Sequence, residues 1–483
     1  MSLVKRFAKD TAIYGVAAIL PKLVNVLLVR LHTGILNPEA YSENTQFYIY
    51  ATYLNVLLTY GMETAFFRFF TKYNNDSKVA QTAFTSIFIS SLAFLALFLG
   101  FGDEISRLLD IDKTYYQILI TILILDTLVV IPYAYLRVTR QPVKFAFYRI
   151  FNISIYAVLN IFLLWWVPKI INELHLENSW VEKYNSHPKV IYIFIANLVA
   201  SSFTFLLFLP VLKKFRLGID KKLLKKMLQY GLPVMVAGLA YATNENLDKL
   251  LIGRLMDKES MGIYAAVYKI GVFMSLYVTA FRLGAEPFFF SQSKEEGAQQ
   301  QYAHILLWFT ILGAVFMVGI MTFLDIIAHL LIGQEVYLKA LNIVPIILTA
   351  YLIFGIYNNL SVWYKLTERT KYGMYLSILG AVITIVFNYL MIPKIGYIAS
   401  AWATLAAYGT MSIASYILGK KYYKVPYQTG KIIFFVLSSA FTGVIIYRYF
   451  LHNYPAKIFI FFLYIAMVYL IERKEIKTYL QKK

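Results

Sequence analysis

Charged side chains inside apolar stretches are the residues of this sequence whose types and spacing could do chemistry. Glu245, Asp248 and Lys249 stand at i, i+3 and i+4 of one such stretch, so a helix would place them on one face. Two carboxylates beside a lysine could bind a proton or a sodium ion, because a desolvated carboxylate favours a bound cation. A structural ion pair is the alternative use of these residues, and the sequence leaves both open.

A second buried cation follows a proline near the middle of the first apolar stretch. A charged side chain at the centre of a membrane-spanning helix costs about 2.5–3.5 kcal/mol, so it usually faces a cavity or a partner. Pro21, directly before Lys22, would kink the helix and free a backbone carbonyl group. This arrangement favours binding of an anionic group, and snorkelling or pairing with Asp126 is the alternative.

The candidate site residues fall into three groups by charge and by depth in the predicted spans. The predicted substrate-binding cations are Lys22, Arg30, Arg149, Lys249 and Lys269; the ion-coupling candidates are Glu63, Asp126, Glu245 and Asp248; and the gate candidates are Arg68, Arg282 and Glu286. Arg30, Arg149 and Lys269 lie near span ends, where the alternative is snorkelling to the interface. The sequence contains no cysteine, so thiolate metal sites are excluded, and we predict no catalytic residue, metal site or cofactor.

The elements that must position these charges are membrane-spanning helices. Of the 483 residues 59% are hydrophobic and 15% are charged, whereas soluble domains carry roughly 25% charged residues. Stretches of roughly 20 apolar residues, the length that crosses a bilayer core, recur about fourteen times. The predicted spans are 11–31, 46–67, 79–101, 115–136, 144–167, 190–212, 231–253, 262–284, 303–324, 340–363, 372–392, 396–418, 430–450 and 456–471. The fold class is therefore an all-α polytopic membrane protein.

The distribution of basic residues predicts the orientation of these spans. The net charge is +20, but the lysines and arginines lie between apolar spans and form no basic face of a soluble domain, so we predict no nucleic-acid partner. Placing both termini in the cytoplasm puts most of the 46 Lys and Arg residues in cytoplasmic loops, as membrane proteins prefer. The largest basic cluster, between Lys213 and Lys226, would then face anionic headgroups.

The two halves of the chain are weakly similar. The segment from Tyr14 to Tyr53 parallels the segment from Tyr230 to Tyr268 with gaps, and internal duplication is common among transporters. We therefore predict two pseudo-repeated six-helix bundles plus two C-terminal helices. The predicted parts are a bundle over 1–212, a basic cytoplasmic linker over 213–229, a bundle over 230–420, and two further helices with a cytoplasmic tail over 421–483.

Four stretches of this framework resemble the polysaccharide transport branch of the multidrug, oligosaccharidyl-lipid and polysaccharide exporter superfamily, which includes O-antigen flippases and the lipid II flippase. They are YGMETAFFRF from Tyr60, NLDKLLIG from Asn246, GIYAAVYK from Gly262 and FRLGAEPF from Phe281. The resemblance covers most of the first twelve spans. The span number and the basic central loop also agree with that family.

The resemblance implies a flippase that moves a polyprenyl-pyrophosphate-linked oligosaccharide from the cytoplasmic to the outer leaflet by alternating access. It implies a multi-pass protein of the bacterial inner membrane whose partners are this glycan, membrane lipids and polysaccharide assembly machinery. Lys22, Arg30, Arg149, Lys249 and Lys269 would bind the pyrophosphate, and coupling to a proton or sodium gradient would use the carboxylates.

Two other functions compete with this prediction. An exporter of cationic drugs, driven by protons or sodium, would need carboxylates to dominate the cavity, whereas the deep bases slightly outnumber the deep acids. A membrane-embedded glycan polymerase or ligase would need catalytic groups in a sizeable outer loop. The longest predicted outer loop, 168–189, holds His175 and His187 without a recognisable catalytic spacing, so the sequence favours a transporter over an enzyme.

Overall fold

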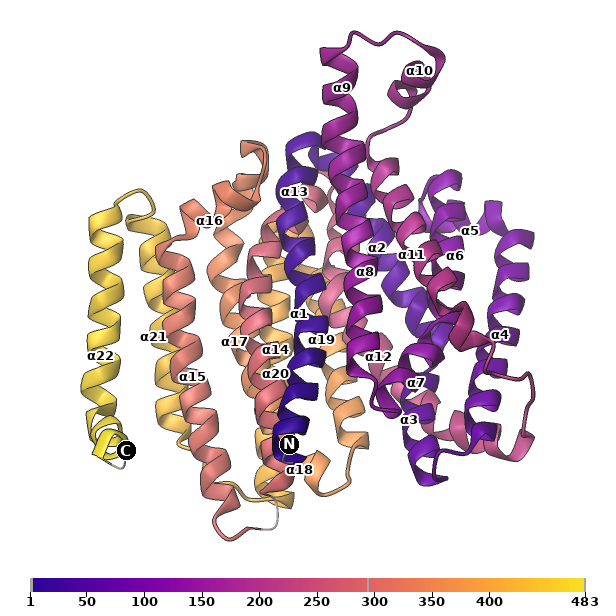
Figure 1. Ribbon diagram of the computed structural model, residues 1–483. Coiled ribbons are helices and arrows are strands. Elements are labelled where there is room, and N and C mark those ends of the chain that lie inside the picture. The colour runs from indigo at the N-terminus through magenta and orange to yellow at the C-terminus, as the bar shows by residue number, and fades with distance from the viewer. Residues whose placement is uncertain (1–2, 293–294, 482–483) are drawn as a thin grey trace. The chain divides into compact units, whose positions relative to one another are not determined.

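The computed structural model describes residues 3–292 and 295–481, and over these residues it consists of helices and their connections without a strand. This confirms the predicted all-α class. The chain forms two compact units, Met1–Gly262 and Ile263–Lys483. Figure 1 traces both from the indigo N-terminus to the yellow C-terminus.

Eleven helical stretches among the described residues are long and apolar enough to cross a membrane. The protein is therefore a multi-pass membrane protein. Three other long helices, α2 (Pro38–Thr59), α12 (Lys221–Leu255) and α20 (Ile398–Tyr422), are more polar and do not belong to this set. The number of about fourteen spans, which would include these three, and the cytoplasmic location of both termini stay predictions.

The first unit contains thirteen α-helices and one π-helical turn among the described residues, the last helix continuing past Gly262. They are α1 (Leu3–Ile35), α2, α3 (Met62–Lys72), α4 (Ser77–Gly100), α5 (Gly102–Leu109), α6 (Lys113–Leu128), α7 (Val130–Val138), α8 (Pro142–Ile161), η1 (Phe162–Trp166), α9 (Val167–Glu173), α10 (Ser179–Ser186), α11 (Val190–Leu212), α12 and α13 (Lys258–Tyr268).

Short polar side chains set the starts of several of these helices. The Asn37 side chain accepts a hydrogen bond from the Ala40 amide at 2.9 Å, directly before a proline at the first helical position. The Asp112 carboxylate accepts from the Thr114 amide at 2.7 Å and begins α6. The Asp220 carboxylate begins α12 in the same way, because it accepts hydrogen bonds from the backbone amides of Leu223 and Lys222. These two hydrogen bonds lower the pKa of its carboxyl group.

The predicted span 46–67 is broken in the structure. Tyr60 and Gly61 both have positive φ, 34° and 72°, and they separate α2 from α3. A Cβ atom on Gly61 would lie 2.2 Å from the Gly231 carbonyl oxygen, so only glycine permits this crossing with α12. The sequence motif that begins at Tyr60 therefore marks a backbone turn and a close helix contact.

Two other predicted spans also depart from straight α-helices. The span 115–136 is interrupted at Val129, where α6 gives way to α7. The span 144–167 runs on through a π-helical turn, η1, to Glu173. The Tyr184 hydroxyl of α10 donates a hydrogen bond to the Leu163 carbonyl of this turn at 2.6 Å, so α10 is anchored to the wide turn.

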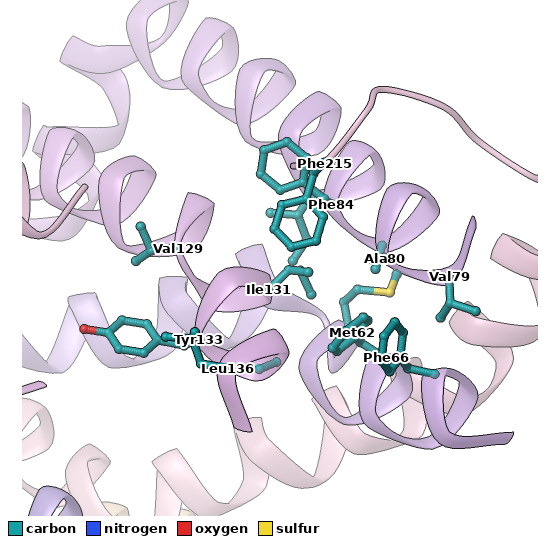
Figure 2. Close-up of a cluster of buried hydrophobic side chains, with 14 of the residues drawn as sticks. Met62, Phe66, Val79, Ala80, Phe84, Val129, Ile131, Tyr133, Leu136 and Phe215 are labelled. Carbon is teal, nitrogen blue, oxygen red and sulfur yellow. The ribbon is translucent and has the colours of Figure 1, made fainter. Parts of the chain in front are cut away.

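Figure 2 shows an apolar cluster of the first unit, in which α3, α4 and α7 pack together. Met62 and Phe66 of α3 lie against Val79 and Ala80 of α4, and the ring of Phe84 stacks on Phe215 at a centroid distance of 5.4 Å. The short helix α7, which carries Pro132, is held inside this cluster. The cluster fixes the ends of α6 and α8 that carry the candidate site.

The second unit begins within α13. Its elements are η2 (Lys269–Gly271), α14 (Val272–Ser291), α15 (Ala298–Thr322), α16 (Leu324–Leu331), η3 (Glu335–Ile343), α17 (Val344–Leu360), α18 (Val362–Leu366), α19 (Lys371–Ile395), α20, α21 (Thr429–Tyr449) and α22 (Tyr454–Gln481). The predicted span 262–284 is thus interrupted by the 3₁₀ turn η2, and 340–363 begins within the 3₁₀ helix η3.

Ion pairs connect α22 to α16 and to α21 within the second unit. Lys457 of α22 is fully buried, and its Nζ lies 2.8 Å from Asp325 Oδ1 of α16. The same ammonium group donates to the Leu451 carbonyl at 2.8 Å. Towards the other end of α22, Lys431 of α21 lies 2.8 Å from the buried Glu472.

Candidate functional site

The candidate site in the first unit is a polar seam along α8 that faces α1, α2, α6 and α11. Arg149, Asn152, Tyr156 and Asn160 stand at i, i+3, i+7 and i+11 of α8, so they share one helical face. Each contacts a polar or aromatic group on another helix of the same unit. The seam is therefore a line of polar and aromatic contacts that joins α8 to other helices of the first unit.

Arg149 and Asp126 form the charged part of this seam. The Asp126 carboxylate on α6 is hydrogen-bonded with Ser201 of α11 and is stabilised electrostatically by Arg149. The Arg149 guanidinium lies over the ring of Tyr133, 4.5 Å from its centroid. Arg149 is exposed, and among the described residues its guanidinium forms neither a hydrogen bond nor an ion pair. The structure thus brings together a predicted substrate-binding cation and a predicted ion-coupling carboxylate.

Hydrogen bonds between helices continue the seam beyond Arg149. The Asn152 amide nitrogen donates to the Thr204 hydroxyl of α11 at 2.9 Å. The Tyr156 hydroxyl lies 3.1 Å from the Tyr48 hydroxyl of α2. Near the end of α8 the Asn160 side-chain oxygen lies 2.8 Å from His32 Nε2 of α1, and both residues are buried.

The partners on α11 are also periodic. Asn197, Ser201 and Thr204 stand at i, i+4 and i+7, and they contact Tyr48, Asp126 and the α8 seam, respectively. Sequence reasoning identified only the charges at this site. The spacing of Asn152, Tyr156 and Asn160 in an apolar stretch was the signal that could have identified the rest.

The predicted trio on α12 forms a tight local ion pair. Lys249 Nζ lies 2.9 Å from Asp248 Oδ1 and donates to the Glu245 carbonyl oxygen at 2.7 Å. Asp248 is fully buried and Lys249 is buried, so the pair is withdrawn from solvent. Lys249 thus contacts the neighbouring aspartate and the backbone carbonyl of Glu245.

The remaining predicted cations are exposed on their helices. Lys22 and Arg30 lie on α1, and Pro21 is accommodated inside this helix. Lys269 lies in the 3₁₀ turn η2 of the second unit, where the helix changes its hydrogen-bonding pattern. Lys269 belongs to the second unit, whereas Arg149 belongs to the first.

Glu63, an ion-coupling candidate, and Arg68, a gate candidate, have partners that the sequence analysis missed. Glu63 lies 3.0 Å from Arg137 of α7, whose guanidinium also covers the ring of Phe67. Arg68 stacks on the ring of Tyr230, 4.4 Å from its centroid. These contacts lie at one end of the first unit, next to the apolar cluster of Figure 2.

The gate candidates of the second unit line a small cavity. Glu286 of α14 forms an ion pair with Lys365 of α18, and Arg282, one turn earlier, lines the same cavity. Asn359 of α17 also lines it, and its buried side-chain oxygen has no hydrogen-bond partner among the described residues. Arg282 and Glu286 are thus brought together, with Lys365 as the unpredicted third charge.

Family comparisons agree with this architecture. A family model described as polysaccharide biosynthesis protein matches residues 7–290, and a second one, MatE, matches residues 233–390. Among curated proteins, the Lsg locus putative protein 1 of Haemophilus influenzae is 22% identical over 305 residues, which cover 61% of this chain and 69% of that protein.

Solved structures of transporters share the fold. The lipid II flippase MurJ in an inward closed conformation superposes with a TM-score of 0.70 at 17% identity, covering 95% of this chain and 99% of that chain. An inward-facing multidrug resistance MATE family transporter of the MOP superfamily gives a TM-score of 0.64 at 12% identity, covering 83% and 94%. At these identities the likeness establishes the fold.

Proposed function

This chain belongs to the polysaccharide biosynthesis protein family, and on that premise we propose that it flips a polyprenyl-pyrophosphate-linked oligosaccharide across the cytoplasmic membrane of a bacterium. The family match over residues 7–290 is the observation that carries the proposal. The fold shared with a lipid II flippase supports it, because that protein moves a lipid-linked cargo of the same general kind.

The seam along α8 supplies groups that such a cargo would need. A pyrophosphate-linked headgroup carries negative charge and many hydroxyl groups, so hydrocarbon is a prohibitive environment for it. Arg149 offers a guanidinium group whose planar fork suits phosphate oxygens, and the ring of Tyr133, on which the group lies, orients it. Asparagine, tyrosine and threonine side chains along the same face replace water around the glycan.

Alternating access would then carry the headgroup between leaflets while the polyprenyl chain stays in lipid. The coupling ion belongs to the same proposal: Asp126 faces Arg149, so protonation or sodium binding at Asp126 would change the net charge that the cargo meets. Glycan assembly enzymes of the same membrane would supply the cargo and receive it.

A reconstituted flipping assay tests the proposal. The purified protein is placed in liposomes with a fluorescent polyprenyl-pyrophosphate oligosaccharide, and the accessibility of the label to an impermeant quencher is followed. We expect protein-dependent flipping, and we expect it to be lost in the double variant Lys22→Gln/Arg149→Gln. The matched control is Lys169→Gln/Lys183→Gln, which removes two exposed cations of the same unit that lie outside the seam.

The drug-exporter alternative makes an opposite prediction in the same liposomes. No flipping of the labelled lipid, together with export of a cationic dye driven by a proton or sodium gradient, would overturn the flippase proposal. Flipping that persists unchanged in the seam variant would leave the protein a flippase but would remove the seam from the cargo path.

A further inference from the structure

A polar cavity of about 440 Å³ lies in the first unit, and none of the α8 seam residues lines it. It forms where the start of α2, the connection between α5 and α6 and the start of α13 come together, near the upper ends of these helices in Figure 1. Its volume falls within the roughly 300–1,000 Å³ of small-molecule sites. The predicted orientation of the spans would place this end at the outer face of the membrane.

The basic residues that line the cavity are engaged with acidic neighbours. Lys258 lies 3.0 Å from Asp110, and Lys113 lies 2.8 Å from Asp103. Arg107 donates from Nε to the Asp103 carbonyl at 3.1 Å. The positive charges at this end of the unit are therefore directed at protein oxygens rather than at an incoming ligand.

Acceptors in the same cavity stay open. Glu43 of α2 is half-buried, and among the described residues it has neither a hydrogen bond nor an ion pair; Lys258 attracts it only from a distance. Gln46, one turn further along α2, is buried with 8% exposure. Its amide nitrogen donates to the carbonyls of Leu109 and Asp110 at 2.8 and 3.2 Å, which fixes the orientation of the amide.

The fixed amide leaves its oxygen available. Gln46 Oε1 receives no hydrogen bond from any described residue, although the side chain lines the cavity. A buried amide held by two carbonyls with its own acceptor open requires a donor from outside the protein. Asp112 adds a carboxylate that already caps α6, and Tyr115 adds a ring and a hydroxyl group to the wall.

We propose that this cavity binds a sugar ring rich in hydrogen-bond donors, either neutral or carrying an amino group, through Glu43 and Gln46. Ring hydroxyls donate to the open oxygens of Glu43 and Gln46, and the Tyr115 hydroxyl offers a donor in return. A carboxylate-bearing sugar is rejected, because Glu43, Asp110 and Asp112 would face its charge. The inference rests on the proposed function in one respect: it assigns part of the glycan a binding site at the predicted outer end.

Direct binding separates this inference from flipping. Saturation-transfer NMR on the full-length protein in nanodiscs is recorded at pH 7 with three probes: glucosamine, methyl glucoside and glucuronate. We expect the strongest transfer to glucosamine, weaker transfer to methyl glucoside and none to glucuronate. Glu43→Gln should weaken glucosamine binding at least fivefold, whereas Glu104→Gln, an exposed carboxylate of α5 outside the cavity wall, should leave it unchanged.

The same preparations are then assayed for flipping, so that each failure is assigned to one proposal. Absence of binding to both glucosamine and methyl glucoside, or equal binding by wild type and Glu43→Gln, overturns the sugar site even if flipping is intact. Sugar binding without any flipping of the labelled lipid leaves the cavity assignment standing and counts against the flippase. Equal binding of glucuronate and glucosamine would also overturn the assignment, because it would show that the acidic wall does not select.

Discussion

Arg149 in the first unit and Lys457 in the second are both cations on helices of membrane-spanning length, but their surroundings differ. Lys457 is fully buried against Asp325, a backbone carbonyl and the face of Tyr454. Arg149 is exposed, its guanidinium lies over the ring of Tyr133, and it interacts with Asp126 only by long-range electrostatics. The ammonium group of Lys457 is thus paired within the protein, whereas the N–H groups of Arg149 are available to a ligand.

This comparison explains why a count of charges inside spans is a poor guide to function. Desolvation of an ion pair is repaid only when the partners are close and fully hydrogen-bonded, as they are at Lys457. A cation that lacks such a partner is tolerated only where polar groups or water can reach it. A structural cation therefore differs from a candidate binding cation in having a close, hydrogen-bonded counter-ion, and its depth in the span does not distinguish the two.

The largest effect is expected from breaking the pair in the second unit. Lys457→Met leaves Asp325 buried without its counter-ion, which typically costs about 3–5 kcal/mol. We expect the detergent-solubilised variant to unfold at a clearly lower temperature than the wild type. The double variant Lys457→Met/Asp325→Leu should recover most of this loss, because both charges are then removed together.

Arg448→Gln on α21 is the matched control, since Arg448 is exposed and its replacement should change the unfolding temperature little.

The ion pair between Lys457 and Asp325 also predicts a pH dependence of stability. Burial alone would raise the pKa of Asp325, but hydrogen bonds from Lys457, Tyr454 and the Ile326 amide outweigh burial and lower it. The stabilisation is therefore present above the ordinary aspartate pKa and is lost as pH falls through the lowered value. A wild type whose stability did not fall with acid more than that of the double variant would contradict this account.

The sequence was sufficient for the fold class and for most of the spans, because long apolar stretches have few structural alternatives. It did not indicate the breaks at Tyr60–Gly61 and Val129, since both depend on packing with distant segments, Gly231 in the first case. A hydropathy average over a window of about 20 residues does not resolve such short turns. The shared motif around Gly61 was visible, but its role as a close backbone contact required three-dimensional information.

Candidate residues show the same division. Sequence reasoning found Arg149, Asp126, Arg282 and Glu286, because a charge in an apolar segment is conspicuous. It missed Arg137 and Lys365, which are counter-ions supplied by other helices, because pairing across 74 or 79 residues leaves no local pattern. The contacts of Lys249 with the Asp248 carboxylate and the Glu245 carbonyl depend on side-chain rotamers, which spacing alone does not fix.

An intermediate effect, on transport and not on stability, is expected at the exposed cation. Arg149→Gln removes the guanidinium from Tyr133, a contact worth about 0.5–1 kcal/mol at an exposed site, so the unfolding temperature should hardly change. The flipping rate in liposomes should fall at least tenfold. Arg149→Lys should recover only part of it, because an ammonium group lacks the planar fork that binds two phosphate oxygens.

Arg140→Gln provides the control for Arg149, because it removes a nearby arginine that lies after α7 and outside the seam. A variant Arg149→Gln that unfolded as easily as Lys457→Met would erase the distinction between the two cations. Normal flipping in a stable Arg149→Gln protein would place the cargo elsewhere.

The smallest effect is expected at the ion pair between Glu63 and Arg137, which is structural like Lys457 with Asp325 but exposed. Their side chains are 43% and 45% exposed, and the charged atoms are 3.0 Å apart. Exposed pairs of this kind contribute about 0–1 kcal/mol, because water screens them and two flexible side chains are held in place. A double-mutant cycle with Glu63→Gln and Arg137→Gln, followed by thermal unfolding, should give a coupling energy below about 1 kcal/mol. A coupling energy this small would show that burial, and not proximity alone, decides the strength of an ion pair in this protein. A coupling energy as large as that of Lys457 with Asp325 would instead show that the ends of α3 and α7, which are predicted to be cytoplasmic, are shielded from solvent.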